Sequence, residues 1–531
     1  MRKSSLLACV LALGVGQAVA QSVNDPFLQV QTVVSGLDAP TTMAFLAPDD
    51  FLVLQKNDGR VRRVVGGVLQ PGEVLDLPVD SFPDRGLLGI VVDPDFLNRP
   101  FVYLFYSEAP ADGQVLTAHR VVRYTWDGAS LGAPRLLLDL PIAPTKFRCG
   151  GLLAFGPDDR LYATMGDLQR IGKLQNRSIG PDPDNTGTIL RIESDGTPPA
   201  DNPFPIASMS RVFAYGLRNS FGFDFDPVTG NLWDTENGQD FYDEVNVVRG
   251  GQNSGWFQIQ GPDDRNTQNQ DALWMAPGAI YRDPAFSWLM SVGPTGIAFA
   301  RSPRLGCARL HDVFVGDANC GNLWHFEPNP VRDGLDFTSA ELQDGVADNA
   351  PDAARCMQEL SEPAFGSGFG VVTDVKSGPD GLLYVVSLTA GAVYRIAPAL
   401  PAALDADQDG VDDACDCTAT SADAWSTTAE VPRLRLSGGA PTRVGWDSQA
   451  ASAGPGTRYT VATGLVSSLR AGDPIGGACR VGSDLAAPTV EDGRPGPAPG
   501  EVFFYLVRPG NACGLGSYGR PAFDAASLPP C

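Results

Sequence analysis

"LLAFGPDDRLYATMGD", residues 152–167, consists of an apolar run, a Gly-Pro-Asp-Asp turn and a second apolar run. Apolar runs on either side of turn residues predict a β-hairpin. The same pattern returns in five other stretches, which begin at Met43, Gly86, Phe221, Thr295 and Thr373. A spacing of roughly 45 to 80 residues between these hairpins fits one four-stranded propeller blade, with its loops, per hairpin.

Six such units predict a six-bladed β-propeller over residues 24–398. A blade buries its faces only against its neighbours, so the ring has to close into a single domain. The alternative is a pair of β-sandwiches whose turns match the pattern by coincidence. The composition favours an all-β fold, because 60 glycines and 44 prolines accompany a hydrophobic content of 43%. Such a chain has many turns but too much apolar surface for disorder.

The first 20 residues have the layout of a cleaved secretory signal. Arg2 and Lys3 precede an apolar segment, and small residues follow before Gln21. We therefore expect a secreted protein, periplasmic or extracellular. The net charge of -23 argues against nucleic acid and anionic membranes as partners, because both require clustered Lys and Arg. No other stretch has the ~20 apolar residues that a membrane-spanning helix needs.

The mature chain keeps nine of the ten cysteines, since Cys9 lies in the signal segment. In an exported protein we expect disulfides, with at most four pairs and one thiol left over. The pairs that we expect are Cys307 with Cys320 and Cys479 with Cys513, although the sequence leaves the connectivity open. Cys149 is expected to be a disulfide partner or a buried thiol.

Residues 403–417 contain the stretch "DADQDGVDDACD". Its aspartates at positions 1, 3, 5, 9 and 12 are Asp405, Asp407, Asp409, Asp413 and Asp416. Carboxylates at alternate positions of a tight loop converge on one hard cation, and Ca²⁺ accepts many oxygen ligands. The spacing resembles a thrombospondin type 3 calcium repeat. The alternative is a solvated acidic linker, which explains the charge but not the period of two.

The last segment, residues 431–531, contains short alternating runs such as "TRYTVATGLV" and "VFFYLVRPGNACG". Their spacing predicts a small antiparallel β-sandwich of fibronectin III type. The predicted fold is thus a six-bladed β-propeller followed by a small β-sandwich domain. A match to a glycosylation acceptor occurs once in the propeller, at Asn176 in "NRS".

Ordered blocks in the predicted propeller carry a family resemblance. They include "DRGLLGIVVDPDF", "GGLLAFGPDDRLYATMGD", "VFAYGLRNSFGFDFDP" and "ENGQDFYDEVNVVRGGQNSGW". In this order they resemble the soluble quinoprotein glucose/sorbosone dehydrogenase family. The resemblance implies a propeller that holds pyrroloquinoline quinone over its central channel, uses a nearby Ca²⁺ to polarise the quinone, and oxidises C1 of an aldose.

The resemblance also implies a catalytic histidine just before "GG", and this chain has Arg148 there. A guanidinium stays protonated and cannot accept the substrate proton. Asp167 and Asp84 are the candidates for a substitute base. We expect His119 and His325 to be structural, since both lie in strand-like runs.

For the cofactor, the resemblance implies an Arg-Asn pair that matches Arg218 and Asn219. Val371 and Thr373 stand where arginines of the last blade are implied, while Arg85 and Arg148 add positive charge near the channel. The metal loop of the family matches "TENGQD", so the main-chain carbonyls of Gly238 and Gln239 are the implied calcium ligands. Asp243 and Glu244 are expected to fix the blade by hydrogen bonds.

The sequence therefore predicts a secreted sugar or aldehyde dehydrogenase-like protein that uses pyrroloquinoline quinone and calcium and has a diverged active site. One alternative is a non-catalytic propeller that binds a carbohydrate or protein partner. Another is a purely structural surface protein, which leaves the channel unused.

Overall fold

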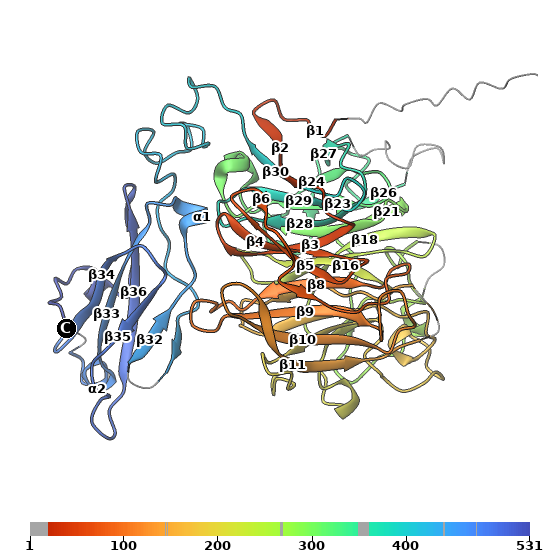
Figure 1. The fold of residues 1–531 in the computed structure, drawn as a ribbon, viewed down its shortest axis with the longest axis horizontal. Coiled ribbons are helices and arrows are strands. Elements are labelled where there is room, and N and C mark those ends of the chain that lie inside the picture. Colours follow the sequence, from red (N-terminus) through yellow and green to blue (C-terminus); the bar gives the residue numbers. More distant parts are fainter. Residues whose placement is uncertain are drawn as a thin grey trace, which may run out of the picture.

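The structure is a computed structural model that describes residues 20–143, 145, 147–265, 269–348, 361–438, 441–473 and 475–531. The predicted signal segment, except its last residue, lies outside these ranges. Six sheets of the described residues follow one another along the chain and form the blades of a propeller, and two smaller sheets follow at the C-terminus. Figure 1 shows the stacked blades with the C-terminal sheets, in blue, beside them. The predicted all-β fold is confirmed, and the alternative of two sandwiches is excluded.

The blades are numbered in chain order, and each is described from its innermost strand outward. Blade 1 contains β3 (Pro40–Ala47), β4 (Asp50–Gln55), β5 (Arg60–Val65), β6 (Val68–Leu69) and β7 (Leu75–Asp76). Blade 2 contains β8 (Leu87–Val92), β9 (Phe101–Glu108), β10 (Ala118–Trp126) and β11 (Leu131–Leu140). Blade 3 contains β12 (Leu153–Phe155), β13 (Leu161–Met165), β14 (Thr188–Ile192), β15 (Val212–Tyr215), β19 (Gln252–Asn253) and β20 (Ile280–Tyr281).

The other three blades complete the ring. Blade 4 contains β16 (Ser220–Phe225), β17 (Leu232–Glu236), β18 (Phe241–Val248), β21 (Phe286–Met290) and β26 (Val346–Ala347). Blade 5 contains β22 (Pro294–Phe299), β23 (Val313–Asp317), β24 (Leu323–Pro328), β25 (Leu335–Asp336), β27 (Ala364–Ser367) and β1 (Ser22–Val23). Blade 6 contains β28 (Val372–Ser377), β29 (Leu383–Ser387), β30 (Ala392–Pro398) and β2 (Leu28–Ser35). Short 3₁₀ turns interrupt the loops: η1 (Lys173–Gln175), η2 (Ala207–Met209), η3 (Gln270–Ala272), η4 (Pro303–Leu305) and η5 (Cys307–Arg309).

All six hairpins expected from the sequence form, and each supplies the two inner strands of a blade. The ring closes because β2, near the N-terminus, pairs antiparallel with β30, the last strand of the propeller. Apolar side chains fill the space between neighbouring blades; one buried cluster joins Leu88 and Phe105 of blade 2 to Leu161 and Leu190 of blade 3. Packing between blades, more than pairing within them, therefore stabilises the ring.

The C-terminal sheets form a separate small unit, here called the C-terminal module. One sheet contains β31 (Arg435–Ser437), β32 (Thr442–Gly445) and β35 (Thr489–Asp492), and the other contains β33 (Arg458–Leu465), β34 (Cys479–Leu485), β36 (Phe503–Asn511) and β37 (Gly514–Leu515). Helices α1 (Ala450–Ala453), α2 (Val466–Arg470) and α3 (Pro521–Asp524) are each about one turn long. Trp446, Tyr459 and Val507 contribute to its own buried core. The domain limits inferred from the sequence, and the fibronectin III type of this module, stay predictions.

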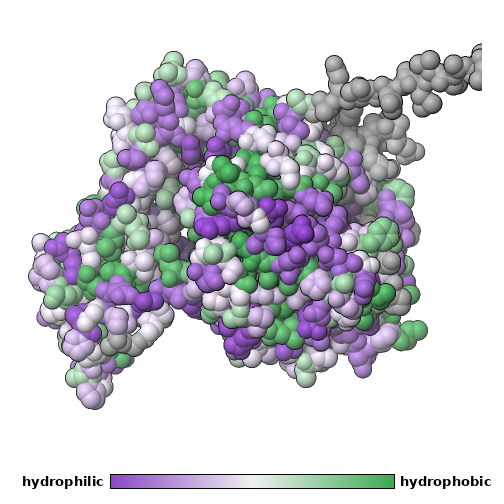
Figure 2. Space-filling view, viewed as in Figure 1, coloured by the Kyte–Doolittle hydropathy of each residue, from purple (hydrophilic) through white to green (hydrophobic). Residues whose placement is uncertain are grey.

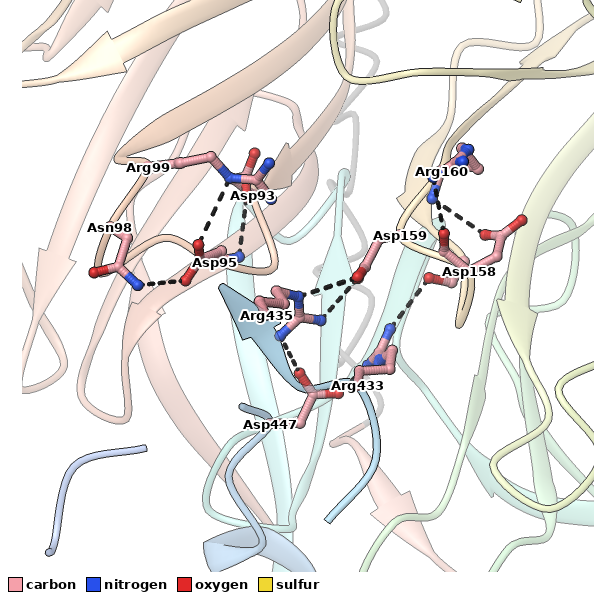
Figure 3. A network of polar contacts seen from close by, with 11 residues as sticks. Asp93, Asp95, Asn98, Arg99, Asp158, Asp159, Arg160, Arg433, Arg435 and Asp447 are labelled. Carbon is pink, nitrogen blue, oxygen red and sulfur yellow. Dashed lines mark hydrogen bonds and ion pairs between the residues drawn. The ribbon is translucent and has the colours of Figure 1, made fainter. Parts of the chain in front are cut away.

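The module contacts loops at one end of the propeller channel. Arg435 of β31 pairs with Asp159, at 2.8 Å, and with Asp447 of the module, and Arg433 donates to the carbonyl of Gly156. Figure 3 shows this network between the module and the β12–β13 turn. The side chain of Arg435 is buried, so its ion pair with Asp159 is held more firmly than a solvated pair on the surface.

Two expected disulfides are wrong. Cys307 pairs with Cys415, Cys417 with Cys513 and Cys479 with Cys531. Cys320 is disulfide-bonded too, Cys149 is a buried free thiol, and Cys356 lies outside the described residues.

The strands explain both corrections. Cys307 and Cys320 lie before and after β23, and five residues of strand separate its ends by about 16 Å, too far for a disulfide. Cys479 lies opposite Thr463 and thus level with Tyr505, whereas Cys513 follows the far end of β36. Two cysteines that flank the same strand therefore lie near its opposite ends, too far apart to pair.

Figure 2 shows hydrophilic and hydrophobic residues interspersed over the visible face of the propeller and the module. Among the described residues, no helix has the length and apolar character to cross a bilayer.

Candidate functional site

The predicted site residues of the propeller gather at one end of the channel. The innermost strands of the blades all run in the same direction, so residues just before them lie at the same end. Arg85 precedes β8, Arg148 precedes β12, and Arg218 and Asn219 precede β16. Asp167 follows β13 and Gly238 follows β17, and these second strands return to the same end. We call this end the channel mouth. The module contacts the opposite end, because Gly156 and Asp159 follow β12.

Arg148 and Asp167 form an ion pair at the channel mouth. Arg148 Nη1 lies 3.0 Å from Asp167 Oδ2, and Asp167 is almost completely buried. The same Oδ2 accepts the indole N–H of Trp256 at 2.8 Å, and Oδ1 accepts the backbone N–H of Gln169 at 2.7 Å. Burial raises the pKa of Asp167, and the Arg148 charge opposes that shift. Both carboxyl oxygens are thus engaged in hydrogen bonds, and a catalytic role of Asp167 stays a prediction.

The backbone of Arg148 is held in an unusual conformation. Its φ of 63° lies in the left-handed region, which non-glycine residues rarely adopt. Its N–H donates to Asp84 Oδ2 at 2.8 Å, which occupies one oxygen of the other candidate base. Asn219 Oδ1 accepts the N–H of Gly150 at 3.2 Å and so joins the segments before β12 and β16. The turn that presents Arg148 is therefore fixed from two sides.

Arg218 lies against the same indole ring as Arg148. The Cζ atoms of Arg148 and Arg218 lie 5.8 and 5.6 Å from the centre of the Trp256 ring. Arg218 Nη1 donates to the carbonyl of Asn237 at 2.7 Å. Burial, followed by the charge of Arg148, lowers the pKa of Arg218. Two guanidinium groups that share one aromatic ring repel each other, so an anion between them would be stabilised.

Arg85 is placed differently from what the sequence suggested. Its Nη1 pairs with Asp80 Oδ2 at 2.7 Å, and its Nη2 donates to the carbonyls of Ala143 and Thr145. The side chain is only 5% exposed. Cofactor contact by Arg85 stays a prediction, but its hydrogen bonds support the loop that crosses from blade 2 to blade 3.

The predicted metal loop follows β17. Gly238 donates its N–H to Asp243 Oδ1 at 2.8 Å, and Asp243 Oδ2 accepts from Ser291 and Gly293. Asp243 therefore shapes the loop that contains Gly238 and Gln239, as the sequence suggested.

Buried acids lie beneath this loop. Glu236 faces Glu244 across the β17–β18 pair, and Glu236 Oε1 accepts the N–H of Arg218 at 2.6 Å. Burial, and then the nearby Glu244 and Asp234, raise the pKa of Glu236, and burial raises that of Glu244 to about 8. Glu236 Oε2 is enclosed and has no hydrogen-bond partner among the described residues. A cation bound by the loop would favour the ionised form of these carboxyls, and their charge would in turn stabilise the cation.

Two cavities adjoin the channel mouth. One of about 450 Å³ is lined by Leu168 and Gln169, which follow Asp167, and by Thr145 and Lys173. The other, of about 390 Å³, is lined by Asp80, Arg85 and Leu116. Ile142 and Ala143 line both cavities, so the blade 2 to blade 3 crossing separates them.

The other candidate residues have structural surroundings. His119 is fully buried, its Nδ1 lies 3.1 Å from Ser107 Oγ, and burial lowers its pKa to about 4. His325 Nε2 lies 2.8 Å from Asp312 Oδ2. Burial raises the pKa of the Cys149 thiol to about 12, which makes it a poor nucleophile. Asn176 is completely buried and bonded to Asn253 and the Trp256 carbonyl, so the glycosylation reading is wrong.

The aspartates of the linker lie away from the channel mouth, beside the outer strands of blade 6. The structure brings oxygens of Asp405, Asp407 and Asp409 within 4.8 Å of one another. Asp413 Oδ1 accepts the N–H of Ala406, and Asp416 Oδ1 accepts that of Thr418. The predicted site residues therefore form two groups, one at the channel mouth and one in the linker.

Trp256 is the residue of the channel mouth that the sequence reasoning missed. It contacts Asp167, Arg148 and Arg218 together. The available signal was its position at the end of the block "ENGQDFYDEVNVVRGGQNSGW", which was used for the fold but not for the site.

Comparison with known proteins fits this architecture. The sequence model of the family described as Glucose / Sorbosone dehydrogenase matches residues 37–395. The chain is 25% identical over 397 residues to the aldose sugar dehydrogenase YliI of Escherichia coli, which covers 70% of this chain and 93% of the relative. The PQQ-bound form of the aldose sugar dehydrogenase from Streptomyces coelicolor superposes with a TM-score of 0.53 at 25% identity, over 70% of this chain and 98% of the other. The human Hedgehog-interacting protein is 27% identical over 225 residues, which is 36% of this chain and 30% of that protein.

Proposed function

The chain belongs to the glucose/sorbosone dehydrogenase family, and from this premise we propose that it is a secreted quinoprotein that binds pyrroloquinoline quinone, calcium and an aldose-type sugar or aldehyde at the channel mouth. The observation that carries the proposal is the Arg148–Trp256–Arg218 group, which offers two positive charges around one aromatic ring. Among the described residues, the unpartnered Glu236 Oε2 beneath the Gly238 loop supports the cation.

When bound, the quinone would accept hydride from the sugar carbon while a divalent cation polarises its carbonyls. The chain's own residues supply the rest. Arg148 and Arg218 would bind and orient carboxylate groups, and the carbonyls of Gly238 and Gln239 would hold the cation. The cavity of about 450 Å³ next to Leu168 and Gln169 offers room for the sugar.

Proton transfer is the step of the proposed reaction that the residues of this site support least. Hydride leaves the sugar carbon only as the hydroxyl proton is taken up, and a positioned base contributes roughly 10²–10⁴-fold to such steps. Arg148 cannot accept the proton, and Asp167 already accepts three hydrogen bonds. The wild-type protein is therefore expected to bind its ligands and to turn over slowly.

One substitution separates binding from proton transfer. Arg148→His places an imidazole beside Asp167, which can orient it as it orients the guanidinium. With pyrroloquinoline quinone, Ca²⁺ and an artificial electron acceptor, we expect this variant to oxidise aldoses at least tenfold faster than the wild type. Arg148→Gln is the matched control, because it removes the charge without supplying a base, and it should not gain activity.

Calorimetry of the quinone with the wild-type protein and Ca²⁺ precedes this assay. Micromolar binding and a faster Arg148→His variant support a quinoprotein with a diverged base. Absence of binding would reject the dehydrogenase proposal.

The second candidate function is a non-catalytic propeller that binds a glycan or protein. The Arg148–Asp167 ion pair at the position of the base favours it, and the Hedgehog-interacting protein is a relative whose name describes protein binding. This function predicts no quinone binding and no gain from Arg148→His.

A further inference from the structure

The loop between β30 and β31 contains a cluster of carboxylates that has no role in the proposed function. Oxygens of Asp405, Asp407 and Asp409 lie within 4.8 Å of one another. Such close like charges repel strongly unless a proton or a cation neutralises them. Arg304 is the positive side chain that acts on Asp405 and Asp409. However, Arg304 donates to the carbonyl of Asp380 and lies 5.4 Å from the Trp425 ring, so other groups engage it.

The two oxygens of each carboxylate have different surroundings. The Oδ1 atoms of Asp407, Asp409 and Asp416 accept backbone N–H groups from Asp409, Val411 and Thr418. Their Oδ2 atoms are enclosed and, in the described ranges, have no hydrogen-bond partner. Asp409 as a whole is only 5% exposed. A buried carboxylate oxygen without a partner is costly. One oxygen of each of these three residues thus shapes the loop, and the other is left for a ligand. Asp405 differs, because its two oxygens accept the N–H groups of Asp409 and Gly410.

We propose that Asp405, Asp407, Asp409 and Asp416 bind one calcium ion, and that this ion locks the junction between the propeller and the C-terminal module. The donors are hard oxygens only, and several carboxylates converge in a flexible loop, which suits Ca²⁺ with its six to eight oxygen ligands better than octahedral Mg²⁺. The two disulfides of the loop keep their cysteines from acting as ligands.

The covalent connections of the loop explain why the ion controls the junction. Cys415 is bonded to Cys307 beside blade 5, and Cys417 is bonded to Cys513 of the module. Asp416 lies between these two cysteines. An ion that holds Asp416 to Asp405 and Asp409 therefore fixes the point where propeller and module are joined. The Arg435–Asp159 contact shown in Figure 3 holds the module at a second place, on the β12–β13 turn.

Calcium titration of the mature protein by calorimetry, without the quinone, tests the site. The variant is Asp409→Asn, and the control is Asp412→Asn, because Asp412 lies in the same loop and its side chain accepts the N–H of Ala414. We expect Asp409→Asn to weaken calcium binding at least tenfold and Asp412→Asn to change it less than twofold. Equal affinities in the wild type and Asp409→Asn would overturn the site. Asp407→Asn, a less buried position, gives the same test if Asp409→Asn does not fold.

Limited proteolysis under non-reducing conditions tests the lock. Chelation should speed cleavage of the wild type between residues 398 and 431 at least fivefold. The Asp409→Asn variant should be cleaved at the fast rate with and without calcium. Cleavage of the wild type at one rate in both conditions would overturn the locking role. The proposed quinone site has no bearing on this result, because cleavage within the linker is the readout.

Discussion

At the scale of single residues, Asp167 shows how hydrogen bonds from several segments hold one buried carboxylate. Its carboxylate accepts from Arg148, Trp256 and Gln169, so its charge is balanced inside the protein. A buried pair of this kind is costly to break, by about 3–5 kcal/mol when one partner is removed. The Arg148–Asp167 pair therefore makes the turn before β12 a structural element.

His119 gives the prediction at this scale. Burial, and then the charge of Arg85, lower its pKa from 6.5 to about 4, while Asp80 opposes the shift. The unfolded chain therefore binds a proton that the folded chain does not, between pH 6.5 and 4. The free energy of unfolding therefore keeps the full contribution of neutral His119 above pH 6.5. It decreases by up to about 3 kcal/mol as the pH falls to 4.

Denaturant unfolding from pH 7 to 4.5 measures this effect. The variant His119→Gln keeps a polar group near Ser107 but does not titrate, so its free energy of unfolding should fall less than that of the wild type. Parallel pH profiles for the two proteins would contradict the assignment.

At this scale, sequence reasoning predicted the positions of residues that precede the innermost strands. Arg148, Arg218 and Asn219 follow from ordered blocks, since their place in a blade fixes their place in space. It did not reveal the contacts of Arg85 and Trp256, because these side chains bond to groups that lie far away in the sequence. Contacts of that kind depend on the closed ring and leave no local pattern.

At the scale of elements, glycines allow the innermost strands to approach one another. A Cβ on Gly89 of β8 would lie 2.1 Å from the carbonyl of Gly151, and one on Gly222 of β16 would lie 2.0 Å from that of Thr295. Gly296 of β22 makes a similar approach to Val375. Three blade junctions thus depend on the absence of a side chain, which the hairpin pattern alone did not reveal.

Gly222→Ala tests this arrangement. The added methyl would clash with the backbone of blade 5, and overpacking of this kind costs about 1–3 kcal/mol or more. The control is Gly132→Ala in β11, where a Cβ would meet nothing within 4 Å. Thermal unfolding should show a lower Tm for Gly222→Ala only; equal values for both variants would contradict the close approach.

At the scale of the whole molecule, the site and the module lie at opposite ends of one channel. The hairpin repeat predicted the ring and the number of blades correctly. It did not predict where the module lies, because that depends on Arg435 meeting Asp159 over 276 residues of sequence. The disulfides of the linker also join residues far apart in the sequence, 108 and 96 positions, which explains why they were not found from spacing.

Arg435→Ala should free the module at its contact with the β12–β13 turn. Arg435 pairs with both Asp159 and Asp447; its loss removes the cation from Asp159, whereas Asp447 keeps its pair with Arg433. Small-angle scattering should show a larger radius of gyration, or a broader distance distribution, than for the wild type. Arg443→Ala, which removes an exposed pair with Glu491 inside the module, is the control and should leave the scattering unchanged. Identical curves for all three proteins would show that the linker alone positions the module.

The closure of the ring by β2 and β30 also sets the timing of folding during synthesis. The side chain of Gln29 bonds to the carbonyl of Pro398, 369 residues later. At about 5–20 residues per second, a ribosome needs roughly 20–70 s to make the partner of a strand that it has already released. During that interval β2 has an open edge, and such edges pair readily with other chains. A nascent chain of this protein is therefore a natural client for a chaperone that covers β2 until the sixth blade is complete.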